Sequence, residues 1–92
     1  MIDFLQGFES DRDMPTVLRS GPYRVYFYGH DLVYEPPHVH VDRDNLSAKF
    51  WLNPIVLARN LGFSAQELRK IERILREHAQ ELQEKWDEDF GY

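Results

Sequence analysis

Two histidines, His38 and His40, have the residue type and spacing best suited to chemistry in this sequence. On a β-strand, side chains two positions apart share one face, about 7 Å apart along the backbone. Two neighbouring imidazoles could bind a divalent metal ion with a third ligand from Glu35, His30 or Asp31, because imidazole and carboxylate groups suit Zn, Mn, Ni or Fe. They could also act as general acid and base, because imidazole titrates near neutrality. A structural role, in which the rings only complete hydrogen bonds, is the third alternative.

An enzyme built on these histidines would be a small ribonuclease or a metal-dependent hydrolase. In the first case Glu35 would serve as a base, and Arg24 or Lys49 would steady a phosphate; in the second, Glu35 would complete a metal site with His38 and His40. The sequence contains no Gly-rich phosphate loop, no Gly-x-Ser-x-Gly motif and no cysteine. Nucleotide-loop, esterase and thiol chemistry are therefore excluded, and metal chemistry, acid–base chemistry or no catalysis remain.

The composition is that of one small folded domain. The chain has 92 residues, of which 42% are hydrophobic and 14% aromatic, above the range of disordered chains. The absence of cysteine excludes disulfides and thiolate metal sites and fits a reducing compartment, so we expect a cytoplasmic protein. The first residues lack the features of a signal peptide, and no apolar stretch is long enough to span a bilayer, so we expect no membrane role.

The charge distribution argues against a generic nucleic-acid binder. The formal net charge is -5, whereas binding to nucleic acid depends on phosphate neutralisation by Lys and Arg. Residues 1–13 sum to -3, residues 14–62 to +1, and residues 63–92, with five basic and eight acidic residues, to -3. An RNA contact would therefore have to use the central segment, whose basic footprint is weak.

The elements that must position the histidines follow from hydrophobic periodicity. We expect an N-terminal extension over residues 1–13, either disordered or a short docking helix, and a single α+β domain over residues 14–92. Turn residues and β-rich segments predict a hairpin around Ser20-Gly21-Pro22, a strand from His38 to Asp42 and a strand from Leu46 to Leu52. Ile55 to Arg59 is ambiguous, and we favour a strand over a short helix.

The C-terminal part of the sequence predicts a helix of about 25 residues. Ser64 and Glu67 have the spacing of a capping box, and an apolar stripe follows at helical spacing. The stripe includes His78, which we interpret as a core histidine, and Gly91 is placed to end the helix. The predicted fold is a small antiparallel sheet of four to five strands covered on one face by this long helix.

A set of motifs in this order resembles the domain of unknown function 4160 family. The resemblance covers about residues 14–91 and rests on Met14-Pro15-Thr16-Val17, Tyr26-Phe27, Pro36-Pro37-His38-Val39-His40-Val41, Ala48-Lys49-Phe50-Trp51-Leu52, Gly62-Phe63-Ser64 and the helix ending in Trp86. It implies a small bacterial or archaeal stand-alone protein, marks His38 and His40 as characteristic positions, and favours a strand at Ile55 to Arg59. The loop from Gly29 to Glu35 is longer than in close relatives.

The same resemblance implies a partner. Members are often encoded beside a protein of another uncharacterised family, domain of unknown function 2442. This gene arrangement has led to the suggestion that the two proteins form a toxin–antitoxin pair. We therefore expect a toxin–antitoxin-type component that acts by binding a protein encoded by a neighbouring gene, through the uncovered sheet face or an edge. A homodimer is a further expectation, and the enzyme described above is the alternative.

Overall fold

The computed structural model describes residues 15–28 and 35–90 of the chain. The predicted extension over residues 1–13, together with His30, Asp31 and Gly91, lies outside the described residues. Within those ranges the chain forms a sheet followed by two helices. The strands are β1 (Thr16–Ser20), β2 (Tyr23–Tyr26), β3 (His38–Arg43), β4 (Leu46–Leu52) and β5 (Ile55–Leu61), and the helices are α2 (Ala65–Glu77) and α3 (Ala79–Phe90).

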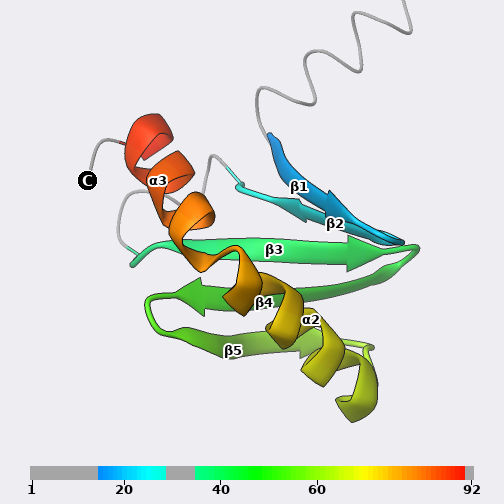
Figure 1. The fold of residues 1–92 in the computed structure, drawn as a ribbon. Helices are drawn as coiled ribbons and strands as arrows, with labels where there is room; N and C mark the ends of the chain where they lie inside the picture. The colour runs from blue at the N-terminus through cyan, green and yellow to red at the C-terminus, as the bar shows by residue number, and fades with distance from the viewer. Residues whose placement is uncertain (1–14, 29–34, 91–92) are drawn as a thin grey trace, which may run out of the picture.

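The sheet is an antiparallel meander in the order β1-β2-β3-β4-β5 (Figure 1). Short turns join most of its strands, and two of them place Gly21 and Asp44 at φ 55°, the left-handed region that glycine and aspartate tolerate best. These turns lie where the sequence predicts them. The predicted α+β class is confirmed, and the ambiguous segment is a strand that extends to Leu61.

The helices cover one face of the sheet, and the hydrophobic core lies between the two layers (Figure 1). Strand alternation places Val39 and Val41 of β3 on this face, where both are fully buried, and cross-strand pairing aligns Val41 with Val25 and Ala48. From the helices, Ile71, Leu75, Leu82 and Trp86 are buried against these strands. The predicted apolar stripe therefore does form the helical side of the core.

The single long helix expected from the sequence is divided at His78. This residue leaves helical geometry at φ -116° and ψ 16°, and its Nδ1 lies 2.9 Å from the Ile74 carbonyl oxygen. Hydrogen bonding resumes with the Leu82 N–H donating to the His78 carbonyl oxygen at 2.9 Å. Because the side chain bonds its own helix backbone, His78 ends α2 instead of only filling the core, and α3 takes a different direction across the sheet (Figure 1).

The start of α2 is tied to the sheet through Glu67. Ser64 caps the helix, its Oγ accepting from the Glu67 N–H at 3.1 Å. The Glu67 side chain does not complete the predicted capping box, because its carboxylate accepts hydrogen bonds from Arg43 Nε at 2.5 Å, Arg43 Nη2 at 2.9 Å and the Tyr23 hydroxyl at 2.8 Å. Arg43 mainly, and Tyr23 as well, lower the pKa of Glu67 below its usual 4.5. Burial, and then Glu67, raise the pKa of Tyr23.

This lowered pKa predicts an acid-dependent loss of stability. A carboxyl group whose pKa is lower in the folded state stabilises the fold above its unfolded pKa, and that contribution disappears as the pH falls through the folded pKa. We expect Glu67→Gln to lower the melting temperature at pH 7 and the difference from the wild type to shrink as the pH falls below about 4.5. Thermal unfolding followed by circular dichroism from pH 7 to pH 2.5 measures this.

Glu72→Gln is the matched control for this experiment, because Glu72 lies on the same helix and forms only an exposed ion pair with Arg76, at 3.1 Å. Such pairs contribute little, so its effect should be smaller at every pH. A deficit of Glu67→Gln that stays constant across the pH range would contradict the role given to the Glu67 carboxylate.

Candidate functional site

His40 lies on the face of the sheet opposite the helices, as its alternation with Val39 and Val41 predicts, whereas the buried His38 ring also packs against Trp86 of α3. A row of paired residues crosses the sheet at His40, with Tyr26 of β2 on one side and Lys49 of β4 on the other. Lys49 in turn pairs with Arg59 of β5. Residues of four strands therefore lie in one row across the sheet, and this row contains a histidine, a tyrosine and two cations.

His38 differs from His40 in being completely buried. It stands beyond the last pair of the β2–β3 ladder, and its ring centroid lies 5.3 Å from Trp86 of α3 and 5.9 Å from Trp51. Its Nδ1 is 2.9 Å from the Pro36 carbonyl oxygen, which can only accept, so this nitrogen carries a proton. The rigid Pro-Pro segment thus fixes the ring in a packed environment.

Glu35 and Lys49 join the histidines through an ion pair. The Lys49 ammonium bonds the Glu35 carboxylate, and Glu35 Oε1 lies 3.8 Å from His38 Nδ1. Lys49 Nζ also sits 4.8 Å from the ring centroid of Trp51, in a cation–π contact. Three predicted site residues, Glu35, His38 and Lys49, are therefore brought together.

Arg24 reaches the histidines indirectly, through Tyr26. The Arg24 guanidinium lies 4.4 Å from the Tyr26 ring centroid and donates to Thr16 Oγ1 at 2.6 Å. Tyr26 stacks on His40 at 5.3 Å with an interplanar angle of 23°. The His38 and His40 rings meet edge to face at 5.3 Å. We call this connected set the histidine cluster, and its members are Arg24, Tyr26, Glu35, His38, His40 and Lys49.

Tyr26 belongs to the histidine cluster, although the sequence did not indicate it as a candidate site residue. Its hydroxyl donates to Asp42 Oδ1 at 3.1 Å. Burial, and then the charge and hydrogen bond of Asp42, raise the pKa of Tyr26 to about 12. The tyrosine therefore stays protonated at neutral pH and supports the His40 ring without acting as a base.

The described residues add no further ligand to the predicted metal site at His38, His40 and Glu35. Within residues 15–28 and 35–90 no group of three or more His, Asp or Glu side chains is arranged to hold a metal ion. The predicted third ligands His30 and Asp31 lie outside these ranges. A divalent metal such as Zn at His38, His40 and Glu35 stays a prediction.

A second candidate surface is β5, a sheet edge of the kind expected for partner binding, although the sequence did not single out this strand. This strand ends the sheet, and every residue after Ile55 is exposed. Its exposed large apolar side chains are Val56 (46%), Leu57 (38%) and Leu61 (58%). We call β5 with these side chains the β5 edge. An exposed edge strand offers unpaired backbone groups to another chain.

The opposite edge of the sheet is less suited to pairing. β1 has five residues against seven in β5, and only Arg19 of them is exposed. Its register with β2 shifts between Thr16 and Leu18, which distorts the ladder. β5 also contains an irregularity, because Lys49 pairs with Arg59 and Phe50 with Leu57, so that Ala58 is an extra residue. The β5 edge is nevertheless the longer and more apolar of the two.

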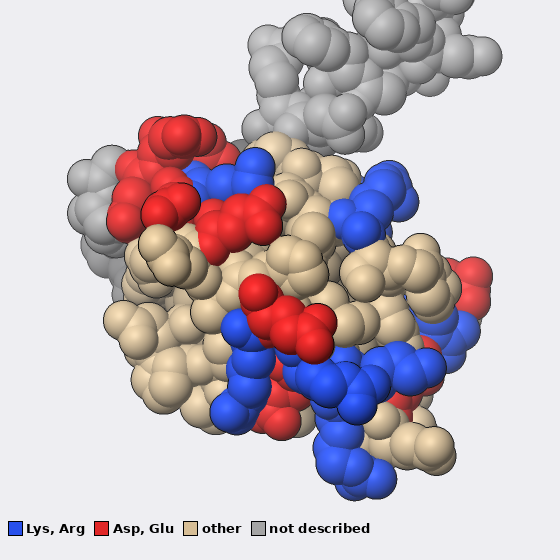
Figure 2. Space-filling model, in the orientation of Figure 1, with Lys and Arg blue, Asp and Glu red and all other residues tan. Residues whose placement is uncertain are grey.

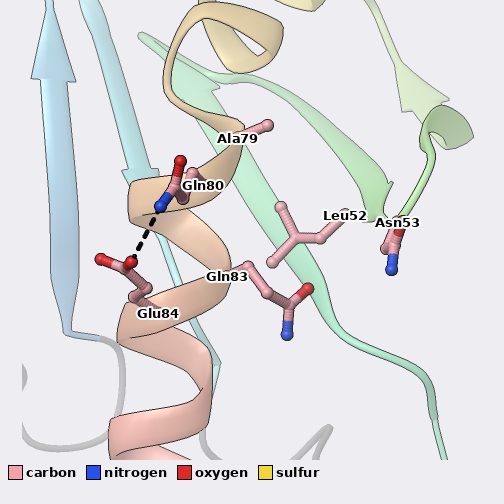
Figure 3. A pocket seen from close by; sticks show the side chains of 6 residues that line it. All are labelled: Leu52, Asn53, Ala79, Gln80, Gln83 and Glu84. Atoms are coloured by element: carbon pink, nitrogen blue, oxygen red, sulfur yellow. Dashed lines mark hydrogen bonds between the residues drawn. The ribbon is translucent and has the colours of Figure 1, made fainter.

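A pocket of about 280 Å³ lies between the first turns of α3 and the end of β4 (Figure 3). Its lining consists of Leu52, Asn53, Ala79, Gln80, Gln83 and Glu84. Gln83 donates to Asp87 at 3.0 Å, while its buried Oε1 has no hydrogen-bond partner among the described residues. Glu84 is the one ionisable side chain in this lining, and it accepts a hydrogen bond from Gln80 at 3.2 Å, so the lining offers no second group for paired acid–base chemistry.

The fold is that of a small α+β protein, a five-stranded antiparallel meander covered on one face by two helices, with His38 and His40 on its third strand. A family model described as a domain of unknown function, DUF4160, matches residues 23–87, and the chain belongs to this family. Comparison with curated proteins and with solved structures gives no match. Neither helix in the described part of the chain has the length and apolar character needed to cross a bilayer.

Proposed function

We propose that this protein is a cytoplasmic toxin–antitoxin-type component that acts by binding a partner protein along the β5 edge. The observation that carries the proposal is the edge itself, a seven-residue strand with three exposed apolar side chains and one strand neighbour. A partner segment that adds a strand there would gain backbone hydrogen bonds and bury apolar surface. The family resemblance gives the candidate partner, a neighbouring gene product of the domain of unknown function 2442 type.

Lysine at the β5 edge should abolish this complex. We expect the double variant Leu57→Lys/Leu61→Lys to raise the Kd for the co-expressed neighbouring gene product at least about 10-fold, because charges on an edge strand oppose strand addition. Both side chains are exposed, so folding should be preserved. Size-exclusion chromatography and calorimetric titration measure the loss.

Gln80→Lys, an added charge at an exposed position of α3, is the matched control and should leave the complex intact. Separate elution of the two wild-type proteins at micromolar concentration would refute a tight complex. Equal binding by the β5 variant would show that the partner docks elsewhere.

A small ribonuclease is the second candidate. The specific observation in its favour is that the structure gathers all five predicted residues in the histidine cluster, with His40 only half-buried and paired across the sheet with Lys49. His40 would act as acid or base, Lys49 and Arg24 would steady phosphate, and Glu35 would orient the cation. The test is whether His40→Ala loses RNA cleavage while its free energy of unfolding stays close to that of the wild type.

A further inference from the structure

The face of the sheet opposite α2 and α3, which we call the open face, gathers most of the positive charge in the central part of the chain (Figure 1). Residues 14–62 contain five cations, and the strand register places four of them on the open face. These four are Arg19, Arg24, Lys49 and Arg59. The fifth, Arg43, binds Glu67 on the helix side. The basic footprint is weak in the sequence, but the fold concentrates it on one face.

Two of these four cations are held in place, and the other two are exposed. Arg24 and Lys49 are half-buried, and both bond to neighbouring side chains. Arg19 and Arg59 are exposed, and neither forms an ion pair with another described residue. The open face therefore has a fixed positive centre, with one exposed guanidinium on β1 and another on β5.

A row of residues crosses the strands near this centre. His40, Lys49 and Arg59 pair side by side on β3, β4 and β5. Neighbouring strands lie about 4.8 Å apart, so this row extends about 10 Å across the sheet. The half-buried Trp51 lies two positions from Lys49, and its ring centroid is 4.8 Å from Lys49 Nζ. Cations beside a partly exposed aromatic ring are the groups that bind phosphates and stacked bases.

The carboxylates on the open face are already engaged. Asp42 accepts from the Tyr26 hydroxyl at 3.1 Å, and Glu35 is bonded to Lys49. Most acidic side chains lie elsewhere, because α3 alone carries five acidic residues and one basic residue, and red side chains gather over it in Figure 2. The net charge of -5 therefore reflects the helical side of the molecule and does not exclude a polyanion on the open face.

We propose that the open face binds single-stranded nucleic acid, with Arg19 and Arg59 contacting phosphates and Trp51 stacking on a base. The inference rests on the ribonuclease candidate above and deepens it, because it names the surface that would hold RNA beside His40, although binding itself requires no cleavage. An extended protein segment suits this row less well, because a strand added to the sheet would run along β5, whereas the row crosses the strands.

Oligonucleotide binding tests the two exposed arginines. A short fluorescein-labelled oligouridylate should bind the full-length protein at about 50 mM salt, measured by fluorescence anisotropy. Arg19→Ala/Arg59→Ala should weaken this binding at least about 10-fold, and each lost phosphate contact should lower the slope of log K against log salt by about 0.7. Arg69→Ala/Arg73→Ala is the matched control, because it removes the same charge from the exposed side of α2, and it should change neither quantity.

Trp51 variants test base stacking. Trp51→Ala should weaken binding of the oligouridylate at least about 5-fold, and Trp51→Phe, which keeps an aromatic ring, should recover part of the loss. A duplex of the same length should bind the wild type less tightly, because its bases are already stacked. Equal binding of the duplex, or full binding by Trp51→Ala, would make this a general polyanion surface and overturn the proposal.

The remaining outcomes separate this inference from the proposed functions. Binding of the oligouridylate without cleavage would refute the ribonuclease and support the binding surface. A preference for an oligodeoxythymidylate of the same length would identify DNA as the ligand of this surface and likewise refute the ribonuclease.

Two results would overturn the inference itself. One is no binding of either oligonucleotide at about 50 mM salt, and the other is equal binding of a polyglutamate peptide, which would give the surface to an acidic protein. Neither result bears on the β5 edge, because Leu57→Lys/Leu61→Lys tests the protein complex without nucleic acid.

Discussion

Trp86→Ala is expected to destabilise the protein by about 3–5 kcal/mol, the range for removing a large aromatic side chain from a core. Trp86 is fully buried where α3 meets the sheet. Its ring centroid lies 4.2 Å from Phe90, 5.3 Å from Phe27 and 5.3 Å from His38. Small domains have total stabilities of about 5–15 kcal/mol, so this variant should lose much of its margin. Urea unfolding followed by circular dichroism measures the change.

Trp51→Ala is the matched control, because Trp51 is half-buried and contacts Lys49 and His38 from the opposite face of the sheet. It should cost less than half as much as Trp86→Ala. Equal losses of unfolding free energy in the two variants would mean that the face carrying Trp51 is packed as tightly as the helical side. The core between the helices and the sheet would then not be the main source of stability.

The sheet could be predicted because its signals are local. Alternation in His38 to Asp42 places the valines inside and His40 on the other face, and the turn residues between strands give each hairpin its direction. The segment after Asn53 is a strand for the same reason, since its β-branched start follows a tight turn from β4. These features depend on neighbours within a few residues along the chain.

The division of the C-terminal helix could not be predicted in the same way. The apolar stripe continues through His78, so periodicity alone favours one helix. The break arises because the His78 side chain bonds the Ile74 carbonyl oxygen. In a continuous helix this oxygen would accept from the His78 backbone N–H instead. The diversion of the Glu67 carboxylate from its own helix to Arg43 likewise depends on a tertiary contact 24 positions away.

The candidate site shows the same limit. Strand geometry predicts that His38 and His40 share a face, but it treats them as equivalent. Their difference in burial comes from Trp86, which belongs to the far end of the chain, and from the end of the β2–β3 ladder. The exposure of β5 similarly depends on the position of α2 and on the order of the strands, and neither follows from the composition of β5 itself.

His38→Ala is expected to cost about 2–4 kcal/mol, from the cavity left by a buried ring and the lost hydrogen bond to Pro36. His40→Ala should cost about 1 kcal/mol or less, because that ring is half-buried and mainly stacks on Tyr26. Urea unfolding of both variants measures the contrast. His38→Asn, whose side-chain amide can donate to the Pro36 carbonyl oxygen, should recover part of the loss.

The two histidines therefore need different tests for catalysis. Loss of RNA cleavage in His38→Ala would not separate chemistry from unfolding, whereas the same loss in a stable His40→Ala would support the ribonuclease. Cleavage retained by His40→Ala would refute the ribonuclease. The two histidines would then have only a structural role, in packing at the start of β3. A His38→Ala protein as stable as the wild type would contradict the packing role, because a ring in contact with Trp86, Trp51 and His40 cannot be removed without cost.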